Sequence, residues 1–267
     1  MSKTILITSC KGGVGKSTVA ANLSAALAFL GKRVILADMD LGNRSLDLIL
    51  GCEDDVVYDV EDVCVGDVDL DRALIRLNKG GEILFLPAPF MYSGRIDKAN
   101  FSRTIEDMKA AYSPDYIILD TSGGAGPSVE LCSSVADRAI IVSSRNPASV
   151  RAAQKSAALL DDWGVGIVQL VINCFELDRR SNQDRAGILS IIDSTGVSLL
   201  GIVPRDRDVE ILCERSRLPF ESKKSISRTA FENIARRIAG ERVHLLSSIK
   251  GLKERQRRRI LSGDSYK

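Results

Sequence analysis

Short apolar runs and longer stretches with helical spacing alternate along the chain. The apolar runs are too uniform for strands with one face in water, so they predict strands buried on both faces. Strands that alternate with helices favour an α/β fold, in which helices cover both faces of a mostly parallel, doubly wound sheet. The predicted strands cover 4–8, 33–37, 82–87, 116–120, 138–143 and 165–173, and the predicted helices cover 19–30, 102–112, 147–163 and 226–240.

The hydrophobic pattern changes after Gly240. Residues 1–240 contain no linker, repeat or low-complexity tract and are predicted to form one domain, whereas 241–267 are predicted to form a basic amphipathic tail. A tail of this kind suits an anionic membrane surface, while a solvated basic helix and a contact with nucleic acid remain alternatives. Its apolar stripe is Val243, Leu245, Leu246, Ile249 and Leu252, and its basic cluster is Lys253, Arg255, Arg257, Arg258 and Arg259.

Composition adds little bias toward any partner. The 267 residues carry a net charge of +2 and are 45% hydrophobic, which favours one well-packed core without a global attraction to nucleic acid or membrane. The N-terminus resembles no secretory signal, and no apolar run is long enough to span a membrane, so we expect a cytoplasmic protein that joins a membrane only peripherally.

The six cysteines are scattered without a C-x-x-C pair, and there is one histidine. In a cytoplasmic chain such cysteines are expected to be small buried hydrophobic residues. The single histidine disfavours histidine-based acid–base chemistry, and the absence of a C-x-x-C pair disfavours an iron–sulfur cluster held by closely spaced cysteines.

Candidate chemistry begins between the first predicted strand and helix, in the loop Ser9–Thr18. Gly12, Gly13 and Gly15 let the backbone turn tightly and bring its N–H groups to phosphate oxygens. Lys16 is predicted to contact the β- and γ-phosphates, Ser17 offers a hydroxyl to Mg²⁺, and the following helix directs its positive end at the anion. The sequence therefore predicts a site for ATP and Mg²⁺.

Carboxylates follow two other predicted strands. Asp38 and Asp40 end one strand and Asp120 ends another, so all three are expected near the nucleotide, because ligands bind outside the carboxyl ends of parallel strands. The glycine-rich stretch 121–127 that follows Asp120 has the freedom needed by a sensor of the γ-phosphate. A loop carboxylate or helix cap remains the alternative for Asp40, and the role of Asp38 is open.

The segment Lys11–Ser17 resembles the deviant Walker A motif of the MinD/ParA family of P-loop ATPases (SIMIBI class), and 40–51 resembles the first switch region of the MinD branch. Cys10 stands where the common P-loop pattern has glycine. The resemblance implies that Lys11 reaches across an ATP-bridged homodimer, that Asp40 positions water or assists magnesium, and that Asn173 and 201–206 contact adenine; a turn-forming role remains open for Asn173.

The predicted site is therefore a set of residues drawn from the whole length of the core. The catalytic residues are Lys11, Lys16 and Asp40, and the metal-binding residues are Ser17, Asp40 and Asp120. The ATP-binding residues are Lys11, Gly12, Gly13, Val14, Gly15, Lys16, Ser17, Thr18, Asn173, Pro204 and Asp206.

By the same resemblance we expect a dimerising ATPase that binds membrane and regulatory protein partners in its ATP state and acts in the placement of the division site. Three alternatives remain: a DNA-segregation ATPase, a flagellar-number ATPase and a metallocofactor-maturation ATPase. The flagellar type usually carries an N-terminal extension, and the maturation type needs a cysteine pair at the dimer interface.

Overall fold

A computed structural model describes residues 2–176, 183–206, 209, 211–212, 215–223 and 225–243. Eight strands form one sheet in the order β3-β4-β2-β5-β1-β6-β7-β8. Seven of them run parallel, and β3 pairs antiparallel with β4 at the edge. The strands are β1 Lys3–Thr8, β2 Val34–Met39, β3 Ile75–Asn78, β4 Glu82–Leu86, β5 Tyr116–Thr121, β6 Arg138–Ser143, β7 Val168–Phe175 and β8 Ser198–Pro204.

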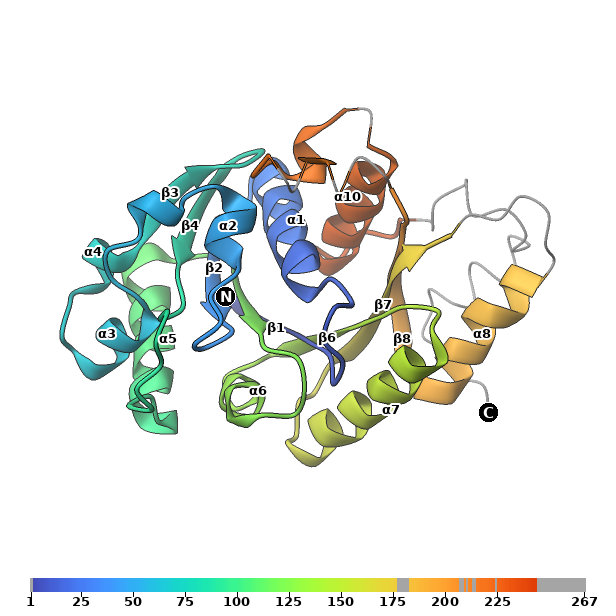
Figure 1. Ribbon diagram of the computed structural model, residues 1–267, viewed down its shortest axis with the longest axis horizontal. Coiled ribbons are helices and arrows are strands. Elements are labelled where there is room, and N and C mark those ends of the chain that lie inside the picture. Colours follow the sequence, from blue (N-terminus) through green and yellow to red (C-terminus); the bar gives the residue numbers. More distant parts are fainter. Residues whose placement is uncertain are drawn as a thin grey trace.

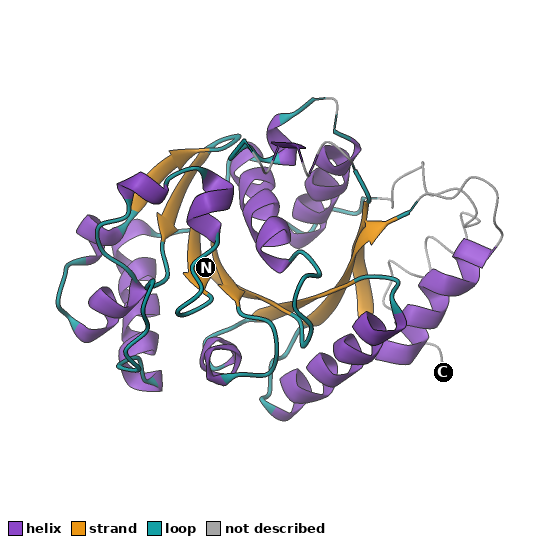
Figure 2. Cartoon of the chain, in the orientation of Figure 1, coloured by secondary structure: helices purple, strands orange, loops and turns teal. Residues whose placement is uncertain are grey.

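Helices cover both faces of this sheet (Figure 1). Two long helices, α1 and α10, lie side by side on one face, and α5, α6, α7 and α8 lie on the other (Figure 2). The helices are α1 Lys16–Phe29, α2 Leu46–Leu50, α3 Val60–Val65, α4 Leu70–Ala73, α5 Lys98–Tyr112, α6 Pro127–Ser133, α7 Pro147–Asp162, α8 Gln183–Thr195 and α10 Ile226–Ile238, with 3₁₀ turns η1 Glu53–Asp55 and η2 Pro219–Glu221.

The sheet divides the core into two apolar layers, and the central strand β1 shows how. Ile5 and Ile7 pack with α1 and α10, whereas Leu6 packs with the layer under α5, α6 and α7. Successive side chains of a strand point to opposite faces, so a strand covered on both sides must be apolar at every position. This is why the buried strands appear in the sequence as continuous apolar runs.

The predicted α/β architecture with a mostly parallel, doubly wound sheet is confirmed. Several elements were missed, among them the antiparallel strand β3, the helices α6 and α8, and the strand β8. The segment 201–206, which by resemblance to the family forms a loop beside adenine, belongs to β8 as far as Pro204. The helical spacing of Ile226, Ala230, Ile234 and Ile238 predicts one buried face for the last helix. This prediction is wrong at Ile226, which is 49% exposed, while Phe231 and Ala235 are buried.

The predicted tail 241–267 lies outside the described residues from 244 onward. The boundary at 240 therefore stays a prediction. Among the helices that the structure describes, none is long and apolar enough to cross a membrane.

Candidate active site

The loop between β1 and α1 is shaped by glycines in the left-handed region of backbone space. Gly13 has a φ of 72° and Gly15 a φ of 86°, conformations that residues with a Cβ rarely adopt. Gly15 is the N-cap of α1, so the helix starts at Lys16, a residue that is only 7% exposed. The loop therefore presents backbone N–H groups and a buried lysine beside the positive end of a helix, which suits a phosphate.

The second glycine-rich loop packs directly against the first. A Cβ on Gly123 would lie 3.0 Å from the Cα of Gly12 and 3.5 Å from Nζ of Lys16. The backbone N–H of Gly124 also donates to the carbonyl of Ser9 at 3.0 Å. Because a larger residue at 123 would push the loops apart, glycine here keeps the candidate second switch in contact with the phosphate loop.

Two carboxylates face each other across neighbouring parallel strands at the same end of the sheet. Asp38 of β2 is in register with Asp120 of β5, and both are fully buried. Burial raises the pKa of Asp38 to about 6, although backbone hydrogen bonds oppose the rise. Burial and then the charge of Asp38 raise the pKa of Asp120 well above its usual range, while Ser17 and Lys16 partly offset this.

This arrangement fits Mg²⁺. Neither carboxylate oxygen of Asp120 has a hydrogen-bond partner of good geometry among the described residues. A buried, unpartnered carboxylate is costly unless a cation or its water shell compensates it. With the Ser17 hydroxyl close by, the donor set is composed of oxygens, which magnesium prefers.

Asp38 and Asp40 have different surroundings. The Asp38 carboxylate accepts backbone N–H bonds from Asp40 at 2.9 Å, Ser45 at 3.1 Å and Leu46 at 3.0 Å. The Asp40 carboxylate is partly exposed and accepts one bond, from Asn43 Nδ2 at 3.2 Å. Asp38 therefore holds the predicted first switch in shape, and Asp40 stays accessible to a substrate. The sequence contained both residues but no signal for this division of roles.

Asn173 is a buried residue of β7, not part of a turn. Its Nδ2 donates to the carbonyl of Val14 at 2.9 Å, and a Cβ on Gly15 would lie 2.4 Å from that nitrogen. The side chain thus ties β7 to the phosphate loop. This contact places Asn173 at the predicted site and gives it a structural role that the sequence did not reveal.

The two remaining adenine-side candidates lie beside the start of α10. Pro204 ends β8, and its carbonyl accepts from the Ser227 hydroxyl at 3.3 Å. The Asp206 carboxylate accepts from Ser225 Oγ at 2.6 Å and from Ser227 N at 3.2 Å. Asp206 therefore stabilises the helix start in this structure, and no contact joins it to the phosphate loop in the described hydrogen bonds.

The other loop residues stand where the sequence predicts them. Lys11 is half-buried on the N-terminal side of the loop, and Ser17 and Thr18 lie in the first turn of α1. The Ser45 hydroxyl lies 3.5 Å from that of Ser17, so the predicted first switch reaches the predicted magnesium ligand.

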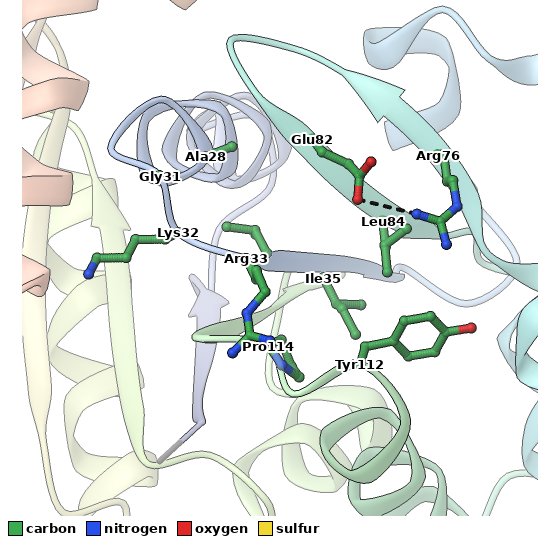
Figure 3. Close-up of a pocket in the computed structure, with 11 residues that line it drawn as sticks. Ala28, Gly31, Lys32, Arg33, Ile35, Arg76, Glu82, Leu84, Tyr112 and Pro114 are labelled. Carbon is green, nitrogen blue, oxygen red and sulfur yellow. Dashed lines mark hydrogen bonds and ion pairs between the residues drawn. The ribbon is translucent and has the colours of Figure 1, made fainter.

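A separate cavity lies at the opposite end of the sheet (Figure 3). It has a volume of about 300 Å³ and is lined by Val34 and Ile35, which begin β2, and by the ion pair of Arg76 with Glu82. None of the predicted site residues lines it. The carboxyl ends of the strands, and not this cavity, therefore carry the candidate site.

The sheet and the glycine loop that joins β1 to α1 define a P-loop nucleotide hydrolase. A sequence profile of the ParA group, described as NUBPL iron-transfer P-loop NTPase, matches residues 1–239. The septum site-determining protein MinD of Synechocystis sp. is 35% identical over 98% of this chain and 100% of its own length.

Solved structures agree with this similarity. MinD in the MinC:MinD cell division complex of Aquifex aeolicus superposes with a TM-score of 0.82 at 32% identity, covering 92% of this chain and 98% of that chain. MinD of Pyrococcus horikoshii, solved with Mg-ADP, gives a TM-score of 0.77 at 27% identity, covering 89% of this chain and 96% of that one.

The chain belongs to the MinD/ParA family of P-loop ATPases. It is an ATP hydrolase that uses ATP with Mg²⁺, as the sequence predicted. The assignment of individual residues to nucleotide and metal stays a prediction, supported by the geometry described above.

Proposed function

We propose that the chain is a MinD-like ATP-operated switch, which dimerises in its ATP state, binds a membrane surface and partner proteins, and acts in the placement of the division site. The observation that carries the proposal is a second lysine beside a complete phosphate site. Lys16 is already buried at the start of α1, whereas Lys11 is half-buried on the N-terminal side of the loop. A second ammonium there is suited to the nucleotide of a partner copy.

Each site residue has a distinct task in this proposal. The glycine loop and Lys16 bind the phosphates, and Asp40 orients the attacking water. Asp38 keeps Asp40 in place through its bonds to the first switch. Mg²⁺, held by Ser17 and by the water shell around Asp120, would neutralise charge on the phosphates.

The same geometry provides a way to distinguish ATP from ADP. The first switch contacts Ser17 through Ser45, and the second packs on Gly12 through Gly123. Only interactions with the γ-phosphate differ between the two nucleotide states, so both loops must depend on that phosphate. We propose that ATP fixes both loops in the dimer and that hydrolysis releases them.

The proposed membrane surface and protein partners rest on the similarity of this chain to known proteins. Relatives are named for septum-site determination, and one is solved in a MinC:MinD complex. We propose the same class of role here, with membrane contact through 241–267 and regulatory protein partners. Nonspecific binding to DNA by a segregation-type ATPase is the alternative, and it predicts a steep salt dependence.

Two lysine substitutions test the dimerising switch. Lys16→Ala should abolish nucleotide binding or turnover, because it removes the buried ammonium from the phosphates. Lys11→Ala should leave ATP binding intact but remove the ATP-dependent dimer. Binding is measured with a fluorescent ATP analogue and dimerisation by light scattering after size exclusion. A Lys11→Ala variant that still dimerises with ATP would contradict the cross-subunit role.

The match of residues 1–239 to a family of iron-transfer P-loop NTPases favours a second candidate, a metallocofactor-maturation ATPase. That function needs cysteines that two copies can bring together. Among the described cysteines Cys52, Cys64 and Cys132 are buried, Cys10 is half-buried and Cys174 is exposed. Anaerobic reconstitution with iron and sulfide decides between the two: stoichiometric iron on the dimer, lost in Cys174→Ser, would favour the second candidate.

A further inference from the structure

Three hydrogen bonds fix the backbone just before the side chain of Lys11. The Ser9 carbonyl accepts from Gly124 N at 3.0 Å, Cys10 N donates to Ser156 Oγ at 2.9 Å, and Lys11 N donates to Ser9 Oγ at 3.2 Å. The first bond comes from the second glycine-rich loop and the second from α7. The direction in which the Lys11 side chain points away from the backbone is therefore set partly by α7, a helix outside the loop.

The bond from α7 has a defined polarity. Ser156 is 3% exposed, and its hydroxyl donates to the Ala152 carbonyl at 3.0 Å, one turn earlier in the helix. A hydroxyl has one proton, so this donation leaves its lone pairs for the Cys10 N–H. Ser156 therefore acts as an acceptor toward the phosphate loop and stays anchored to its own helix.

Water is poorly placed to substitute for this hydroxyl. Ser156 lines a crevice between α7, the second glycine-rich loop and α6, with Cys10, Gly124, Val129 and Trp163. The crevice is too narrow to hold a water molecule. Removing the hydroxyl would leave the Cys10 N–H without an acceptor in a packed setting, and such a group tends to move in order to find one.

We propose that Ser156 is a positioning residue for ATP hydrolysis, which couples α7 to the phosphate loop by fixing Cys10 and, through it, the backbone of Lys11. The inference rests on the proposed role of Lys11. Ser156 itself touches neither nucleotide nor metal in this proposal. A displacement of α7 along its axis would pull on Cys10 and change the aim of Lys11, while the contacts around Lys16 would stay in place.

The test compares Ser156→Ala with Ser149→Ala, a matched change on the same helix. Ser149 is also fully buried, and its hydroxyl accepts a backbone N–H bond, from Ser144 at 3.3 Å, in a loop that does not carry the lysines. ATP affinity, turnover, ATP-dependent dimerisation and melting temperature are measured on the full chain. Comparing turnover with ATP affinity and melting temperature separates the loss of the hydrogen bond from a general loss of packing.

We expect Ser156→Ala to lower turnover and dimer association about tenfold while ATP affinity stays within about twofold, because a small misplacement of a catalytic group costs rate more than binding. Ser149→Ala should lower the melting temperature but leave turnover unchanged. Equal turnover in the two alanine variants would overturn the inference and leave the switch proposal intact. Absence of any ATP-dependent dimer in the unsubstituted chain would instead overturn the switch proposal, and the turnover comparison would still decide the role of Ser156.

Discussion

At the scale of single residues, the most informative pair is Asp38 and Asp40. They are two positions apart on one strand end, yet one carboxylate is fully buried with three backbone partners and the other is partly exposed with one side-chain partner. Asp38 is held in place by the chain itself, so it is suited to shaping the loop. Asp40 retains the access that a residue acting on water needs.

These surroundings predict different effects for two substitutions. Asp40→Ala should lower turnover by ~10²-fold, the scale of a lost base, with little change in the loop. Asp38→Asn should also lower turnover but should speed hydrogen exchange at the amides of Ser45 and Leu46, because an amide group has one acceptor oxygen where the carboxylate has two. Mass-spectrometric exchange measures the difference. Equal protection in the two variants would remove Asp38 from the role of loop clamp.

At the scale of elements, α10 and β8 meet at a glycine. A Cβ on Gly201 would lie 2.4 Å from Cγ1 and 2.8 Å from Cδ1 of Ile234. The α10 helix also binds β8 through Arg237, whose Nη1 donates to the Leu200 carbonyl at 2.7 Å. The close approach of α10 to the edge strand β8 therefore depends on the absence of a side chain at Gly201.

Gly201→Ala should lower the free energy of unfolding by about 1–3 kcal/mol, because the added methyl overpacks a full interface. Gly166→Ala is the matched control, since a Cβ there would meet no atom within 4 Å. Urea denaturation compares the two variants. A loss at Gly166 as large as at Gly201 would show that the contact with Ile234 does not determine the effect, because Gly→Ala without a clash lowers the entropy of the unfolded chain and should not destabilise.

At the scale of the whole molecule, the two ends of the sheet differ. The carboxyl ends of the strands gather the phosphate loop, both acidic strand ends and the Asn173 contact, whereas the amino end of β2 borders the cavity with Arg76 and Glu82. A switch located at the carboxyl ends of the strands can change between monomer and dimer with the bound nucleotide while the sheet stays fixed. Binding to a membrane or to DNA must then follow from dimerisation, because two copies bind a surface with greater avidity than one.

Co-sedimentation with anionic liposomes tests this expectation. The full chain should pellet with vesicles in ATP more than in ADP, and a chain ending at Gly240 should remain in the supernatant while hydrolysing ATP. Random double-stranded DNA replaces the vesicles in a parallel experiment. Retention on DNA in both nucleotide states, with none on vesicles, would favour the segregation alternative.

Much of the fold could be predicted because buried parallel strands leave a strong local signal. The bounds predicted for the strand Arg138–Ser143 match the observed ones, since its four central residues, 139–142, are apolar and fully buried between layers that cover both faces. The edge strand β3 was missed because it is half exposed, at Ile75, Arg76, Leu77 and Asn78, and lacks that signal. The exposed Ile226 shows the opposite error, in which a periodic apolar position faces away from the core.

The sequence by itself determined the phosphate loop, because glycines at φ angles closed to other residues and a lysine at a helix start are local requirements. It also placed Asp38, Asp40 and Asp120 at one end of the sheet, since strand polarity follows from the alternating pattern. Only the tertiary structure decided what each carboxylate contacts and how Asn173 and Ser156 reach the loop. The Asn173 and Ser156 contacts join residues more than 140 positions apart, and hydrogen bonds at such separations depend on packing that no local pattern encodes.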